Sequence, residues 1–141
     1  MTKKQDIQET LMRIESDRKE LESMMQQGRM LESSIVEIRA TIEVLEQLKK
    51  NKPGTEIMVP IGSDSFIRAS IKDNERVLIG VGARVSVEKK IDDAVETLKG
   101  RAEELSSALV GIRERAMQVN NEMEGLSQEA QTMMQRQNLQ E

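Results

Sequence analysis

The sequence predicts a mainly α-helical protein with a small β part, in which two long helices form an antiparallel coiled coil around a central insert of two β-hairpins. Three observations predict this fold. Proline is absent from both long flanking segments, apolar residues recur there every three or four positions, and apolar residues alternate with period two between them. The predicted segments are residues 1–52, 53–88 and 89–141, within one structural domain.

The C-terminal helix has the clearest coiled-coil pattern. Its two apolar series are Ile91, Leu98, Leu105, Ile112, Val119, Leu126 and Met133, and Val95, Ala102, Leu109, Ala116, Met123, Ala130 and Gln137. Steps of four and three residues alternate, which is the 3.5-residue period of a coiled coil, and only Gln137 is not apolar. The small alanines allow a facing helix to come close.

The N-terminal helix shows two apolar frames instead of one. The first frame contains Ile7, Leu11, Ile14, Leu21 and Met25, with Arg18 intruding, and the second contains Leu31, Ile35, Ile38, Ile42, Leu45 and Leu48. The change of frame near Gly28 predicts a stammer, a shift of three residues in the heptad register. Gly28 itself is predicted to lie on the seam, where it costs about 1 kcal/mol relative to alanine.

The two helices are predicted to pack against each other. Each helix has an apolar seam that water would otherwise contact, and the two are similar in length. Antiparallel pairing would place Leu48 near Ile91 and Ile7 near Met133. Both chain ends would then meet at the end of the coil remote from the central insert.

The central segment changes period from 3.5 to two. Lys52, Pro53 and Gly54 end the first helix, and four short strands follow, separated by turns at residues 62–65, 72–75 and 82–83. The candidate assembly residues are the alternating apolar ones: Ile57, Val59, Ile61, Phe66, Ile67, Ile71, Val77, Ile79, Val81, Val85 and Val87.

This β-segment predicts an oligomer. At roughly 35 residues it is shorter than the ~40 residues at which a domain usually becomes stable by itself. Its apolar face is larger than the base of one two-helix coil could cover, and its strand edges are unpaired. We therefore expect the segment to pair with β-segments of other subunits, and the protein to be an obligate oligomer.

The composition argues against an enzyme. Cys and His are absent, which removes thiol and imidazole chemistry together with the usual metal ligands, and no cofactor is expected. The glycines at 80 and 82 form a lone GxG within a strand pattern, without the helix of a dinucleotide site. The net charge of −4 disfavours nucleic acid as a partner. We expect no membrane span and, because residues 1–6 lead into a charged helix, no signal peptide.

The central segment resembles the prefoldin alpha subunit, most closely the archaeal form. The resemblance rests on residues 54–62 (GTEIMVPIG), 65–71 (SFIRASI), 77–83 (VLIGVGA) and 87–89 (VEK), with flanking helices of the family's length and order. One departure is Arg84, where the family pattern often has glycine. If the turn requires a positive φ, Arg84 is expected to be strained.

The resemblance implies an ATP-independent cytoplasmic chaperone, a holdase. Two alpha and four beta subunits would assemble through an intersubunit β-barrel, to which the two hairpins of each alpha subunit contribute. The coiled-coil tips would hold unfolded proteins and transfer them to a group II chaperonin.

The methionines and the tip each have two interpretations. Eight of the ten methionines lie in the helices, in the half remote from the β-segment, and Met12, Met30, Met117 and Met134 are predicted to lie off the seam. Methionine is a good helix former, but its flexible thioether also suits an adaptable surface for varied clients.

The tip residues either close the coil or contact clients. The client-binding hypothesis names Ile7, Leu11, Met12, Met133, Met134 and Leu139.

A structural adaptor or tether is the alternative to a chaperone. The same coil could act as a spacer between fixed partners. Promiscuity discriminates the two, because a chaperone suppresses aggregation of unrelated unfolded proteins whereas a tether binds one defined partner.

Overall fold

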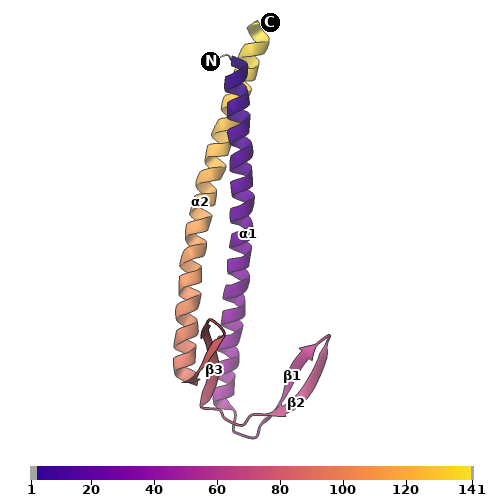
Figure 1. Cartoon of the computed structure of the whole chain (residues 1–141), viewed down its shortest axis with the longest axis vertical. Coiled ribbons are helices and arrows are strands. Elements are labelled where there is room, and N and C mark those ends of the chain that lie inside the picture. Colours follow the sequence, from indigo (N-terminus) through magenta and orange to yellow (C-terminus); the bar gives the residue numbers. More distant parts are fainter. Residues whose placement is uncertain (1–2, 141) are drawn as a thin grey trace. The chain divides into compact units, whose positions relative to one another are not determined.

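The computed structural model describes residues 3–140. The elements, in chain order, are α1 (Lys3–Lys50), β1 (Glu56–Gly62), β2 (Ser65–Ser70), β3 (Arg76–Gly82), β4 (Val85–Lys90) and α2 (Ile91–Gln140) (Figure 1). The predicted fold class of two long helices and two central hairpins is therefore confirmed. Residues 1–2 and 141 lie outside the described residues. They belong to the predicted helical segments, and residues 1–2 also to the stretch on which the expected lack of a signal peptide rests.

The chain divides into two compact units. Unit 1 combines the part of α1 up to Ser33 with the part of α2 from Leu105 onward, and unit 2 is Ser34–Glu104, which includes both hairpins. The hairpin segment ends at Lys90, two residues after the predicted boundary, and α2 begins directly at Ile91. Asp92 and Asp93 lie in the first turn of α2, where the helix dipole favours negative charge.

The heptads predicted for α2 are all present. Every member of its two predicted series is buried or half-buried, from Ile91 to Gln137. Val119 is fully buried, and Leu109, Leu126 and Ala130 are nearly so. A single continuous seam therefore runs along α2.

The stammer predicted for α1 is wrong. Its buried and half-buried positions continue in one alternating frame of three- and four-residue steps: Ile7, Thr10, Ile14, Asp17, Leu21, Met24, Gly28, Leu31, Ile35, Ile38, Ile42 and Leu45. Thr10, Asp17 and Met24 occupy the seam, whereas Leu11, Arg18 and Met25 are exposed. The physical reason is the partner helix. Because α2 presents an uninterrupted heptad seam, α1 keeps that period even where the seam position is polar.

In unit 2 the helices and the second hairpin share one core. Leu45 of α1, Ile91, Val95 and Leu98 of α2, and Ile79 of β3 are buried together, with Ala94. Leu48 packs on the same cluster as Ile91, as the antiparallel pairing predicted. Lys49 Nζ donates to Asp92 Oδ1 at 2.7 Å across the two helices.

In unit 1 the two helices also pair antiparallel. Arg13 and Glu122 lie 3.4 Å apart, and Glu20 and Arg115 lie 3.4 Å apart. The residue number on α2 falls as the residue number on α1 rises, so the two helices run in opposite directions. A third pair joins Glu32 of α1 to Arg113 of α2. A Cβ built on Gly28 would lie 3.6 Å from Leu109 Cδ1, which confirms that Gly28 lies on the seam.

Candidate functional site

The two hairpins repeat the same structure with a spacing of 20 residues. In β1–β2, Ile57 is opposite Ala69 and Val59 is opposite Ile67. In β3–β4 the equivalent pairs are Val77 with Lys89 and Ile79 with Val87. The same backbone hydrogen bond closes each hairpin at 2.9 Å, from the amide of Ile71 to Thr55 O and from the amide of Ile91 to Glu75 O. The central segment therefore contains two copies of one hairpin structure.

Each hairpin turns through three successive residues with positive φ. They are Gly62 (109°), Ser63 (48°) and Asp64 (57°), and Gly82 (107°), Ala83 (50°) and Arg84 (61°). A register shift precedes each turn, between Pro60 and Gly62 and between Gly80 and Gly82. Arg84 has a positive φ, so the condition under which strain was expected there is met, and a side chain in this conformation costs roughly 1–2 kcal/mol relative to glycine.

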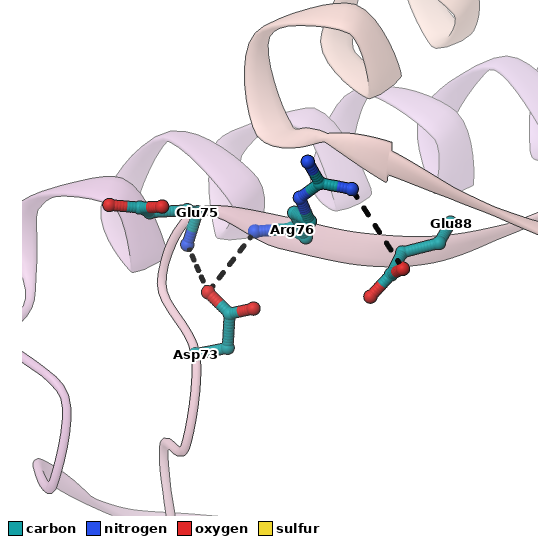
Figure 2. Close-up of polar contacts among 4 residues, drawn as sticks. All are labelled: Asp73, Glu75, Arg76 and Glu88. Atoms are coloured by element: carbon teal, nitrogen blue, oxygen red, sulfur yellow. Dashed lines mark hydrogen bonds and ion pairs between the residues drawn. The ribbon is translucent and has the colours of Figure 1, made fainter.

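The second hairpin is anchored at both of its ends. Asp73 Oδ1 accepts hydrogen bonds from the amides of Glu75, at 2.8 Å, and Arg76, at 3.4 Å, while the Arg76 guanidinium lies 4.0 Å from Glu88 (Figure 2). Near the turn, Arg101 of α2 donates to the carbonyl oxygen of Gly80 at 2.6 Å. The Arg101 contact holds β3–β4 against α2, whereas the other contacts lie within the hairpin and its preceding turn, with Asp73 in the turn role that the sequence predicted.

The first hairpin has the same apolar face without the same cover. Ile57 and Val59 are equivalent to Val77 and Ile79, but neither belongs to the core that buries Ile79. Several predicted assembly residues of both hairpins are exposed, namely Ile61, Phe66, Ile67, Val81, Val85 and Val87, whereas Ile71 and Ile79 are buried and Ile57, Val59 and Val77 are half-buried. Exposed β-branched residues beside open strand edges are typical of a surface that pairs with another sheet.

The predicted tip residues gather at one end of unit 1. Met133 shares a hollow with Lys3, Asp6 and Arg136, so the first turns of α1 lie beside the last turns of α2. Leu11 is 43% exposed, Met12 is 72% exposed and Leu139 is 86% exposed, and Met134 is also exposed. Ile7 is buried in the seam and Met133 is half-buried there. The structure thus brings the six residues to the same end but presents only four of them to solvent.

The exposed apolar residues Leu11 and Met134 lie on the same side of the coil as the Glu32–Arg113 ion pair. Each is three heptads from a member of the Glu32–Arg113 ion pair, Leu11 along α1 and Met134 along α2. Since a heptad repeat returns each residue to the same side, the tip carries an apolar pair where the shaft carries an ion pair.

All eight helical methionines lie in unit 1, as predicted from their positions. The four predicted to lie off the seam are exposed: Met12, Met30, Met117 and Met134. Met25, assigned to the seam from sequence, is exposed as well, because Met24 takes the inward position. The helical parts of unit 2 contain no methionine.

Within residues 3–140, no group of three or more Asp or Glu side chains is arranged to hold a metal ion. Over the same range no helix is long and apolar enough to cross a membrane.

A family model for the prefoldin subunit matches residues 3–136, nearly the whole chain. The chain belongs to the prefoldin family. Its similarity to the alpha subunit, predicted from the central motif, is confirmed by many archaeal relatives.

Three relatives described as prefoldin subunit alpha illustrate the similarity. One from Methanosarcina barkeri is 32% identical over 134 residues, which cover 93% of this chain and 93% of the relative. One from Methanopyrus kandleri is 42% identical over 79 residues, 56% of this chain and 50% of the relative. One from Thermofilum pendens is 36% identical over 60% of this chain and 66% of the relative. The chain therefore spans about half to two thirds of the last two relatives.

A solved structure supports the same fold. A chain in the cryo-EM structure of filamentous PFD from Methanocaldococcus jannaschii superposes with a TM-score of 0.73 at 19% identity, covering 83% of this prefoldin-family chain and 97% of that chain.

Sequence reasoning missed two exposed apolar residues of the hairpins. Leu78 of β3 is 76% exposed and Met58 of β1 is similarly open, on the face opposite Val77 and Ile57. Phe66, named with the assembly residues, lies on this second face because it is opposite Pro60. Period two could have identified Met58 and Leu78 and placed Phe66 with them, since residues one position away from the β-branched series point to the other face.

Proposed function

We propose that this prefoldin-family chain is the alpha-type subunit of a holdase chaperone that works without ATP. Two such subunits would assemble with four beta subunits through an intersubunit β-barrel built from the hairpins. The coil ends would hold unfolded proteins and pass them to a group II chaperonin in the cytoplasm. The observation that carries the proposal is the pairing, in one chain, of open β-hairpins with a methionine-rich coil end.

The hairpins support the assembly part of the proposal. Two copies of the same hairpin are present, yet only the second packs into the helical core, through Ile79. In the first, the equivalent Ile57 and Val59 are only half-buried and Ile67 is exposed, which favours cover by another chain. Apolar side chains are also exposed near both turns: Ile61 and Phe66 in the first hairpin, with Phe66 on its opposite face, and Val81 and Val85 in the second.

The coil end supports the client part of the proposal. Leu11, Met12, Met134 and Leu139 are exposed together, and methionine adapts to surfaces of different shape. No single contact of this kind is strong. Several coil ends held by one scaffold would bind one client through their effective concentration, which needs no nucleotide chemistry.

The test is light scattering by an unfolded, aggregation-prone protein diluted from denaturant, without ATP, in the presence of the chain assembled with a prefoldin beta subunit. Suppression across unrelated clients is expected. Suppression confined to one partner, or none from an assembled complex, would favour the tether instead.

A tip variant tests which surface is used. Changing Leu11, Met133 and Met134 to serine should weaken suppression while the oligomer, measured by mass photometry, stays intact. The matched control changes Val36 and Val44 to serine, since these valines are also exposed on α1 but lie in unit 2. The beta subunits should carry disabled tips in both cases. Equal activity of the tip and control variants would contradict the assignment.

A further inference from the structure

Each hairpin has a second face, which the proposed barrel does not use. It lies opposite the face that carries the paired β-branched residues, and is called here the outer face. At its centre is one directly opposed cross-strand pair, Met58 with Arg68 in the first hairpin and Leu78 with Glu88 in the second. All four side chains are exposed. Each outer face therefore presents one large apolar residue beside one charge.

The charges of the first hairpin are reversed in the second. Equivalent positions lie 20 residues apart, and each of the three charged residues between Thr55 and Ile71 has an equivalent of opposite sign: Glu56 and Arg76, Asp64 and Arg84, Arg68 and Glu88. The ion pairs within the hairpins are reversed as well, with Arg68 at 3.5 Å from Glu56 and Arg76 at 4.0 Å from Glu88. Exposed pairs of this kind add little stability within a hairpin, so their reversal matters mainly for what faces each hairpin.

The two outer faces fit each other better than either fits itself. Sheets that pack face to face lie about 10 Å apart. In a stack with the two turns at opposite ends, the registers place Met58 over Leu78 and Arg68 over Glu88. Two first hairpins stacked in the same way would oppose two copies of Arg68, and two second hairpins would oppose two copies of Glu88. Like charges that face each other are unfavourable, so the mixed stack is selected.

The two outer faces of one chain do not meet. The hairpins form separate two-stranded sheets, and Met58 and Leu78 both remain exposed. The second hairpin is fixed on its other face, because Ile79 packs into the helical core and Arg101 donates to the carbonyl oxygen of Gly80. A complementary face is available on a second copy of the chain, since every copy carries one outer face of each kind.

We propose that the outer face of the first hairpin binds the outer face of the second hairpin in another copy of this chain, with Met58 against Leu78 and Arg68 against Glu88. The contact goes beyond the proposed barrel and leaves the barrel-forming face of each hairpin free. Because each copy carries both faces, two copies can bind each other through two such contacts, as in a closed symmetric dimer.

Sedimentation equilibrium of the full chain alone tests the contact through paired charge reversals. A first-hairpin swap combines Glu56→Arg with Arg68→Glu, and a second-hairpin swap combines Arg76→Glu with Glu88→Arg. Each swap keeps the net charge and the ion pair within its own hairpin. Either swap alone opposes like charges and should raise the dissociation constant of self-association about tenfold. Both swaps together should return it to within about threefold of wild type.

Two further variants complete the test. Leu78→Ser should also weaken self-association, because it removes the apolar centre of the second outer face without changing any charge. The matched control for the swaps combines Glu15→Arg with Arg18→Glu, which reverses an exposed ion pair on α1 away from the hairpins. This control should self-associate like wild type.

Unchanged self-association in the single swaps, or no recovery in the double swap, would overturn the proposal. Altered hydrogen exchange of the hairpins in a chain that stays monomeric would place the contact within one chain, which would overturn the second copy as the partner. Loss of only the complex with a beta subunit would overturn it too, since the face would then belong to that subunit. Aggregation suppression is measured separately on the mixed complex, so a failure of the proposed function would leave this contact standing.

Discussion

Gly28→Ala is predicted to stabilise the coil by more than glycine replacement elsewhere on the helices. Gly28 is buried on the α1 seam, and a Cβ there would meet Leu109 Cδ1 at 3.6 Å, an ordinary van der Waals contact that needs no repacking. Alanine in a helix interior gains about 1 kcal/mol over glycine. Burial of the added methyl group against Leu109 adds roughly 0.5–0.8 kcal/mol, for a total of about 1.5 kcal/mol.

Two other helical glycines are matched controls. Gly111 and Gly125 are exposed on α2, and a Cβ at either position would meet nothing within 4 Å. Gly111→Ala and Gly125→Ala should therefore gain only the helix-propensity part, about 1 kcal/mol or less.

The assay is denaturant unfolding followed by far-ultraviolet circular dichroism, at one fixed protein concentration because the stability of an oligomer depends on it. The midpoint should rise most for Gly28→Ala, with no change in the dependence on denaturant. A destabilised Gly28→Ala, or a gain no larger than that of the two controls, would refute the reasoning that the seam at Gly28 has room for a methyl group.

Further predictions concern unit 2. Ile79→Ala should destabilise the protein by about 2–4 kcal/mol and free the second hairpin from the helices, since Ile79 is buried in the shared core. Faster hydrogen exchange in β3 and β4 would show the release, and protection equal to wild type would contradict it. Ala94→Leu should destabilise by roughly 1–3 kcal/mol, because Ala94 is fully buried and added methylene groups overpack a close-packed core. Thermal unfolding measures this, and an unchanged midpoint would show that the core can expand. Arg84→Gly should stabilise by about 1 kcal/mol, because glycine adopts the φ of 61° without strain; a lower denaturation midpoint would instead indicate that the Arg84 side chain contributes contacts. Arg101→Met should weaken the packing of the second hairpin on α2 by about 1–2 kcal/mol through loss of the hydrogen bond to Gly80. Faster hydrogen exchange of the β3 amides would show this, and exchange equal to wild type would argue against it.

The α2 helix shows how much a clear pattern determines. Its two series from Ile91 to Gln137 were assigned from spacing alone, and every member is buried or half-buried. The strands and turns followed in the same way, since β-branched residues with period two leave few alternatives to hairpins once glycines mark the turns. Strain at Arg84 was predicted only for a turn with a positive φ, and the structure shows that φ.

The α1 helix shows where this reasoning fails. Leu11 is more apolar than Thr10, and Met25 is the same residue type as Met24, so the sequence of α1 gives no reason to place Thr10 and Met24 inside. Asp17 would not be chosen for a seam by any hydrophobicity pattern. The frame of α1 depends on the facing helix, whose heptads are continuous, and so it could not be read from α1 alone.

The sequence by itself thus determined the element types, their order, the antiparallel pairing and the family resemblance, because these depend on local period, turn residues and a specific central motif. Only the tertiary structure decided which of two similar hairpins packs on the helices, which residues fill the α1 seam and that Met25 instead of Met24 faces solvent. Those features arise from contacts between segments distant in the chain, where the partner surface and not the residue's own hydrophobicity selects the buried side.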